Sequence, residues 1–233
     1  MGLDAEHREL VVRRALAGLV AAVLAAGAAA AECRLAMTIG LDVSASIDGR
    51  EHALQRQGLA AALVEPEVVD AFLAVEGVAM LQVYEWSGRA RQTVILDWTP
   101  VARAADLVEA ADLLRVAPRA DREFPTAIGA ALAFAAQQVE RVPCAAGMVN
   151  ISGDGENNDG VRPADVRREL GFAGVTINGL VVGGDLERLR RYYEAQVMHG
   201  PGSFVEVALS FDDFAEAMRR KLVRELGPVA AAF

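Results

Sequence analysis

The chain has 233 residues, of which 53% are hydrophobic, and its formal net charge at pH 7 is −9. This length and apolar content allow one α/β domain with a full core. The negative charge, and the lack of a basic cluster with interleaved aromatic residues, argue against nucleic acid or an anionic membrane surface as a partner.

The first segment, residues 1–31, has the layout of a secretory signal peptide. Basic residues precede an unbroken apolar run over residues 15–30, and three alanines then offer a cleavage point before Glu32. A membrane anchor is the alternative, but this Ala-rich run is short and weakly hydrophobic for a stable span. We therefore expect a protein that is exported, periplasmic or secreted, and that does not insert into a membrane after cleavage.

The next element is an apolar run at residues 35–41, long enough for a strand buried on both faces. Asp48 and Glu51 follow at the spacing of an N-cap residue and its N3 partner, which predicts a helix over residues 48–64. A buried strand, a polar loop and a helix start together form one half of a βα unit.

The loop between that strand and that helix carries Asp42, Ser44 and Ser46 at alternate positions. Ligands of open parallel sheets bind beyond the carboxyl ends of the strands, where this loop lies. One carboxylate and two hydroxyls suit a hard cation such as Mg²⁺ better than zinc. The same residue types also favour a plain N-cap, and these three residues alone support both interpretations equally.

Strands and helices alternate through the rest of the chain. We expect further helices over residues 66–73, 102–116, 125–139, 162–172, 185–197 and 210–222. We expect further strands over residues 78–86, 90–98, 147–152, 175–182 and 204–207. The first two of these strands are so close that they must form an antiparallel hairpin.

This order predicts an α/β fold in which a doubly wound, mostly parallel sheet has one antiparallel edge strand and helices on both faces. No internal repeat or low-complexity linker is present. We therefore expect a signal peptide at residues 1–31, a single domain at residues 32–227 and a short tail at residues 228–233.

The two cysteines of the chain, Cys33 and Cys144, each precede a predicted strand. If the strands at residues 35–41 and 147–152 are parallel neighbours, both cysteines lie at the same end of the sheet. An exported protein meets an oxidising compartment, so we expect a disulfide that stabilises the fold by roughly 4–5 kcal/mol. Two buried free thiols are the alternative.

Three motifs, in this order, resemble the von Willebrand factor type A (vWA) domain. They are the D-x-S-x-S of Asp42, Ser44 and Ser46, then Thr126 in the run Thr-Ala-Ile-Gly-Ala-Ala-Leu, then Asp154-Gly155 after an apolar strand. The resemblance covers nearly all of the mature chain. The signal-peptide context and the Glu85-Trp86-Ser87-Gly88 turn are similar to an exported bacterial subgroup of that family, which would make the protein bacterial. It implies a vWA- or Rossmann-like fold.

The resemblance also implies a metal-ion-dependent adhesion site (MIDAS). Ser44 and Ser46 would bind Mg²⁺ directly, Thr126 would bind it directly or through water, and Asp42 and Asp154 would act mainly through waters or hydrogen bonds. Mn²⁺ or Ca²⁺ could take the place of Mg²⁺. Because neutral hydroxyls would fill much of the coordination sphere, the ion would stay electrophilic and would attract an acidic side chain of a protein partner.

Single residues outside the first loop have simpler explanations. Thr126 alone would more often cap a helix, and Asp154 alone could serve an Asx-turn. A calcium loop that starts at Asp154 lacks the glycine required at its sixth position and the glutamate required at its twelfth. The histidines His52 and His199 belong to none of the motifs, and we expect them at the surface.

The resulting functional hypothesis is an exported, non-catalytic, Mg²⁺-dependent protein-binding module. The motifs contain no histidine and no pair of a nucleophile and a base, so we do not expect an enzyme. A Mg²⁺-dependent phosphohydrolase with Asp42 as nucleophile is one alternative. Such an enzyme usually has a second carboxylate two residues after the nucleophile, where this chain has Ser44. It also usually has a lysine in the site, whereas the only lysine here is Lys221 in the last helix. A metal-free, structural domain of the same fold is the other.

Overall fold

A six-stranded sheet in the order β3-β2-β1-β4-β5-β6 forms the middle layer of the protein. The computed structural model describes residues 32–119, 123–170 and 172–227, so the expected signal peptide and tail lie outside the described residues. The strands are β1 Cys33–Asp42, β2 Val78–Trp86, β3 Gln92–Val101, β4 Ala146–Gly153, β5 Val175–Val182 and β6 Val205–Ala208. All neighbouring strands are parallel except β3, which pairs antiparallel with β2 at the edge. The predicted fold class is confirmed.

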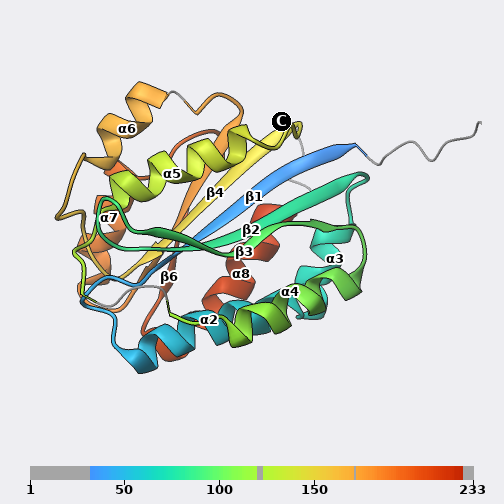
Figure 1. Ribbon diagram of the computed structural model, residues 1–233, viewed down its shortest axis with the longest axis horizontal. Helices are drawn as coiled ribbons and strands as arrows, with labels where there is room; N and C mark the ends of the chain where they lie inside the picture. Colours follow the sequence, from blue (N-terminus) through green and yellow to red (C-terminus); the bar gives the residue numbers. More distant parts are fainter. Residues whose placement is uncertain (1–31, 120–122, 171, 228–233) are drawn as a thin grey trace, which may run out of the picture. The chain divides into compact units, whose positions relative to one another are not determined.

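Helices cover both faces of the sheet (Figure 1). One face carries α2 Gly49–Leu63, α3 Pro66–Leu73, α4 Ala104–Val116 and α8 Phe214–Leu226, which follows a 3₁₀ turn at Phe211–Asp213. The other face carries α5 Ile128–Glu140, α6 Pro163–Leu170 and α7 Leu186–Gln196. Strand β1 supplies both cores: Met37 and Ile39 point to the first, and Ala36 points to the second. This alternation explains why most of its residues are apolar.

The β1–α2 connection has the predicted capping box. Asp48 Oδ1 accepts a hydrogen bond from the Glu51 backbone N–H at 2.8 Å, and the Asp48 N–H donates to Glu51 Oε2 at 2.9 Å. These two bonds satisfy amide groups that a helix start leaves without partners. They fix the direction in which the chain leaves the loop that carries Ser44 and Ser46.

Several expectations need correction. Helix α5 begins at Ile128, not at residue 125, and β3 spans Gln92–Val101 rather than residues 90–98. His52 is buried, with its Nε2 atom 2.6 Å from Glu85 Oε1, so its expected surface position is wrong. His199 is half-buried and forms an isolated bridge with Ile177. Both histidines are held by residues distant in the chain, which their local sequence does not reveal.

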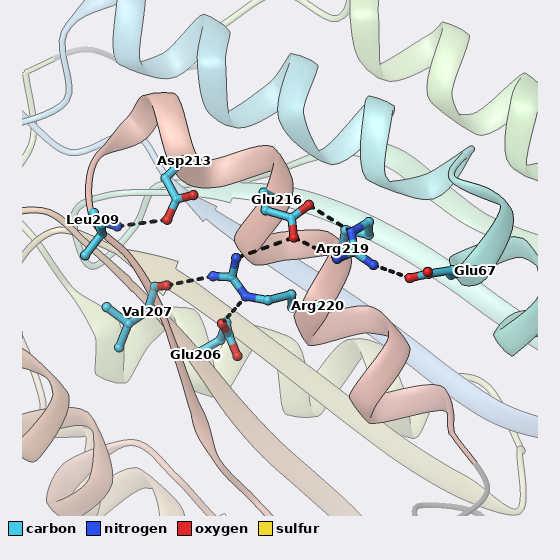
Figure 2. Close-up of polar contacts among 8 residues, drawn as sticks. All are labelled: Glu67, Glu206, Val207, Leu209, Asp213, Glu216, Arg219 and Arg220. Atoms are coloured by element: carbon cyan, nitrogen blue, oxygen red, sulfur yellow. Dashed lines mark hydrogen bonds and ion pairs between the residues drawn. The ribbon is translucent and has the colours of Figure 1, made fainter.

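The closing helix α8 is tied to its neighbours by charged side chains (Figure 2). Arg219 contacts Glu67 of α3, and Arg220 donates to Glu206 Oε1 of β6 at 3.0 Å. Asp213 accepts from the Leu209 N–H at 3.1 Å just before the helix. On its inner side, α8 buries Lys221 against Glu225.

The disulfide predicted between Cys33 and Cys144 is present. It joins positions 111 residues apart whose Cα atoms are separated by 4.6 Å. The pairing follows from the sheet, because β1 and β4 are parallel neighbours and Leu35 is in register with Ala146. In the part of the chain that the structure describes, no helix is long and apolar enough to span a bilayer.

Candidate metal centre

The first part of the site is the turn at the carboxyl end of β1. Asp42 is fully buried, and its Oδ1 accepts a hydrogen bond from the Ser44 backbone N–H at 2.8 Å. The side chain of Gln55 in α2 donates to the Asp42 carbonyl at 2.9 Å. These contacts hold the turn against the sheet, so that Ser44 is 1% exposed while Ser46 is open to solvent.

The second part comes from the neighbouring strand. Leu41 of β1 is in register with Ser152 of β4, so Asp154 follows β4 at the same edge of the sheet. Ser46 Oγ donates to Asp154 Oδ1 at 2.8 Å, and Ser44 Oγ lies 3.2 Å from Ser46 Oγ. Two hydroxyls and a carboxylate, from residues up to 110 positions apart in the chain, therefore meet at one point.

Thr126 reaches the same edge from a third segment. Its N–H donates to Asn158 Oδ1 at 2.8 Å, and its carbonyl accepts from the Asn158 N–H at 2.9 Å. A Cβ built on Gly155 would lie 3.7 Å from Thr126 Oγ1, which places the threonine hydroxyl beside the residue after Asp154. Thr126 precedes the α5 N-cap, Ala127, so it is bound to this loop rather than capping the helix.

Arg119 is a contributor that sequence reasoning missed. Its guanidinium donates to the carbonyls of Val43 at 3.1 Å, Ile47 at 2.8 Å and Asp48 at 3.2 Å. It therefore clamps the whole turn that carries the two serines. The segment around it reads only as a polar loop, and no local pattern marks an arginine that binds carbonyl groups more than 70 residues earlier in the chain.

The electrostatics of the site favour a cation. Burial raises the pKa of Asp42 to about 7, and the negative charge of Asp154 adds to this, against the hydrogen bonds from Ser44 and the charge of Arg119. Burial also raises the pKa of Asp154. Asp42 Oδ2 is buried and has no hydrogen-bond partner among the described residues. A buried carboxylate oxygen without a partner is rare and calls for a donor or an ion.

The oxygen donors fit a hard cation such as Mg²⁺. Within the described residues, no three His, Cys, Asp or Glu side chains gather as a metal-binding group, so a site here depends on the hydroxyls of Ser44, Ser46 and Thr126. The calcium-loop alternative is not supported, because its acidic residues pair with arginines. Glu156 pairs with Arg188, and Asp165 pairs with Arg162 and Arg168.

An open hollow adjoins the cluster on its solvent side. It encloses about 370 Å³, and its lining includes Asp154, Glu156, Asn158, Asp185 and Arg188. It is bordered by the loop after β4 and by the start of α7. The site is therefore accessible from solvent rather than sealed.

A family model described as a protein of unknown function (DUF1194) matches residues 32–230. No curated protein matches the chain. Among solved structures, proximal thread matrix protein 1 from the mussel byssus, in a form with a zinc-occupied MIDAS motif, is 18% identical with a TM-score of 0.60. That match covers 84% of this chain and 48% of the other.

Two further structures show the same likeness. A von Willebrand factor type A protein from Catenulispora acidiphila is 20% identical over 84% of this chain and 43% of its own, with a TM-score of 0.57. The pilus adhesin SpaC from Lactobacillus rhamnosus GG is 12% identical over 83% and 31%, with a TM-score of 0.59. The chain spans about half the length of these proteins or less. The likeness confirms the predicted vWA-like fold.

Proposed function

Because the chain belongs to the DUF1194 family of proteins of unknown function and has a vWA-like fold, we propose that it is an exported, non-catalytic module that binds a protein partner through a divalent cation. The proposed ion is Mg²⁺, with Mn²⁺ or Ca²⁺ as substitutes. The proposed ligands are Ser44, Ser46 and Thr126, supported by Asp42 and Asp154.

The observation that carries this proposal is the contact between Ser46 Oγ and Asp154 Oδ1 at 2.8 Å, with Ser44 Oγ beside it. An ordinary capping serine would bind an amide of its own helix, as Asp48 does here. These hydroxyls instead face each other and a carboxylate from another strand. An oxygen cluster of this kind is a typical ligand set for a hard cation.

The bound ion would supply a positive centre at the solvent-facing side of the cluster. Asp42 and Asp154 would balance its charge, while the serine hydroxyls would leave it electrophilic. Ser46 is exposed and Asp154 is half-buried, so a carboxylate on a partner protein could approach from that side. That solved structures of the same fold include a pilus adhesin and a byssus matrix protein supports an interaction role.

The absence of a catalytic role belongs to the same proposal. A phosphohydrolase would need Asp42 free to attack a phosphate, but its carboxylate is fully buried and bound to the Ser44 amide. Lys221, which such a reaction could use, is buried in α8 against Glu225. Turnover of a generic phosphomonoester that Asp42→Asn abolishes would revive the hydrolase.

Isothermal titration with Mg²⁺ and Mn²⁺ tests the proposal. The wild-type protein should bind with a measurable heat, and Asp42→Ala should lose it, because the substitution removes the buried negative charge. Asp112→Ala is the matched control, since Asp112 is exposed and pairs only with Arg115 among the described residues. Equal heats for the wild type and Asp42→Ala would refute the metal site.

A metal-free structural domain is the second candidate. It is favoured by the lack of three grouped His, Cys, Asp or Glu side chains in the part of the chain that the structure describes. In this case neither ion would produce heat with the wild-type protein. A pull-down from periplasmic extract that gives the same bands with Mg²⁺ and with chelator would also support it.

A further inference from the structure

Two buried polar groups that have no hydrogen-bond partner in the described part of the chain face the same small gap beside the candidate metal centre. One is Asp42 Oδ2, and the other is the hydroxyl of Tyr193 in α7. Both side chains are fully buried. Neither group has a hydrogen bond among the described residues, although buried polar atoms nearly always have one.

The gap is created by a glycine of β4. A Cβ placed on Gly153 would lie 2.8 Å from the Tyr193 hydroxyl oxygen and 2.9 Å from Asp42 Oδ2. Any larger residue would therefore push into the space between these two oxygen atoms. The absence of a side chain at Gly153 allows both oxygen atoms to lie within 3 Å of the same point.

A second glycine lets the tyrosine reach that point. A Cβ on Gly179 of β5 would lie 2.8 Å from the Tyr193 ring. The ring therefore lies over Gly179 of β5, and its hydroxyl lies beside Gly153 of β4, close to Asp42 Oδ2.

Resting on the proposed function, we propose that Tyr193 is a positioning residue of the metal centre, whose hydroxyl donates a hydrogen bond to Asp42 Oδ2 across the gap at Gly153, through one water molecule. A carboxylate oxygen can accept two hydrogen bonds. Oδ2 could therefore still accept a second bond from a water molecule or hydroxyl that binds the ion. Oδ1 is already held by the Ser44 amide. With both oxygens held, the carboxylate has one orientation before a metal arrives.

The chemistry of the pair supports the direction of the bond. A phenol hydroxyl can donate, whereas a carboxylate in its ionised form, the form that binds a cation, can only accept. A tyrosine hydroxyl has an ordinary pKa of about 10, so it carries its proton at neutral pH and is able to donate. Partners that orient metal ligands in this way typically change metal affinity about 10- to 100-fold when they are removed.

Titration of the protein with Mn²⁺ tests this role. Binding is measured as the decrease in the electron paramagnetic resonance signal of free Mn²⁺. Tyr193→Phe removes only the hydroxyl and should raise the Kd for Mn²⁺ about tenfold. Tyr84→Phe is the matched control, because that buried hydroxyl donates to the Ala131 carbonyl at 3.0 Å and not to the site. Its Kd should stay within about twofold of wild type.

Thermal unfolding of the same proteins separates positioning from simple packing. In chelator, Tyr84→Phe should lower the Tm, while the rise in Tm on adding Mn²⁺ should be smaller for Tyr193→Phe than for wild type or Tyr84→Phe. Gly153→Ala, which fills the gap, should raise the Kd as Tyr193→Phe does, and the combined variant should show no further increase.

The outcomes distinguish this role from the proposed function. If wild type binds Mn²⁺ and Tyr193→Phe binds it equally well, the positioning role is refuted and the metal site stands. If wild type takes up no Mn²⁺, the proposed function fails and the role of Tyr193 fails with it. If Tyr84→Phe also weakened Mn²⁺ binding tenfold, the effect would reflect general damage to the fold, and the assignment of Tyr193 would be overturned.

Discussion

At the scale of single residues, the most informative group is the Asp42 carboxyl. Its pKa of about 7 in the folded, metal-free protein, against 3.8 as the ordinary value, means that folding takes up a proton between these pH values. Stability from this group is present at low pH and is lost as the pH rises through 7. The unfolding free energy should thus fall by about 2–3 kcal/mol from pH 5 to pH 8 in chelator.

Urea denaturation at both pH values measures this effect. Asp42→Asn keeps an acceptor for the Ser44 amide but does not titrate, so it should lack this part of the pH dependence. Excess Mg²⁺ should remove the fall in the wild type, because the ion stabilises the charged carboxylate. Identical pH dependence for wild type and Asp42→Asn would contradict the assignment.

Gly129, in the first turn of α5, contacts the loop that follows β4 and carries Asp154. Its N–H donates to Asn157 Oδ1 at 3.1 Å, and a Cβ there would collide with the Val161 carbonyl oxygen. Gly129→Ala should therefore destabilise the protein by about 1–3 kcal/mol. Gly49→Ala is the control, since a Cβ there meets nothing within 4 Å. Equal stability of the two variants in thermal unfolding would contradict this packing.

At the scale of elements, α8 shows the difference between buried and exposed ion pairs. Lys221 and Glu225 are fully buried between α8 and the sheet, where Asn150 and Asn178 also contact them. Glu225→Ala leaves the lysine charge unpaired and should cost about 3–5 kcal/mol. Arg219→Ala removes the outward pairs with Glu67 and Glu216 (Figure 2) and should cost about 1 kcal/mol or less. Chemical denaturation that finds equal costs would refute the distinction.

The elements themselves were largely predictable, because apolar periodicity and capping residues are local signals. The bounds of β2 and β5 agree with their apolar runs, and the capping box of α2 follows from the spacing of Asp48 and Glu51. The start of α5 was not predictable, since Asn158 binds the Thr126 backbone from 32 residues away. Lys221 was also unexpected in a core, because its partner Asn150 lies on β4, 71 residues earlier in the chain.

At the scale of the whole molecule, the disulfide closes most of the fold into one loop. Cys33 and Cys144 are separated by 111 residues and join the starts of two central strands. Replacing both cysteines with serine should lower the free energy of unfolding by about 4–5 kcal/mol, because the unfolded chain gains freedom. Urea denaturation of the oxidised protein and of the variant measures the loss. A change below about 1 kcal/mol would contradict this estimate.

The candidate site was predictable in part, because its motif residues follow strands whose carboxyl ends share an edge. The spacing of Asp42, Ser44 and Ser46 and the position of Asp154 after an apolar strand are visible in the sequence. The residues that hold them are not. Arg119 acts through backbone carbonyls, and the hydroxyl of Tyr193 reaches the site over two glycines of other strands. Such contacts depend on the assembled sheet.

The most direct test of the central idea is diffraction from crystals soaked with Mn²⁺ and measured near the manganese absorption edge. We predict one anomalous peak at the carboxyl edge of β1 and β4, within about 2–2.5 Å of oxygen atoms from Ser44 and Ser46. Asp42→Ala crystals soaked in the same way should lack it. Well-ordered wild-type crystals with no peak at this position, or with peaks only elsewhere, would contradict the account.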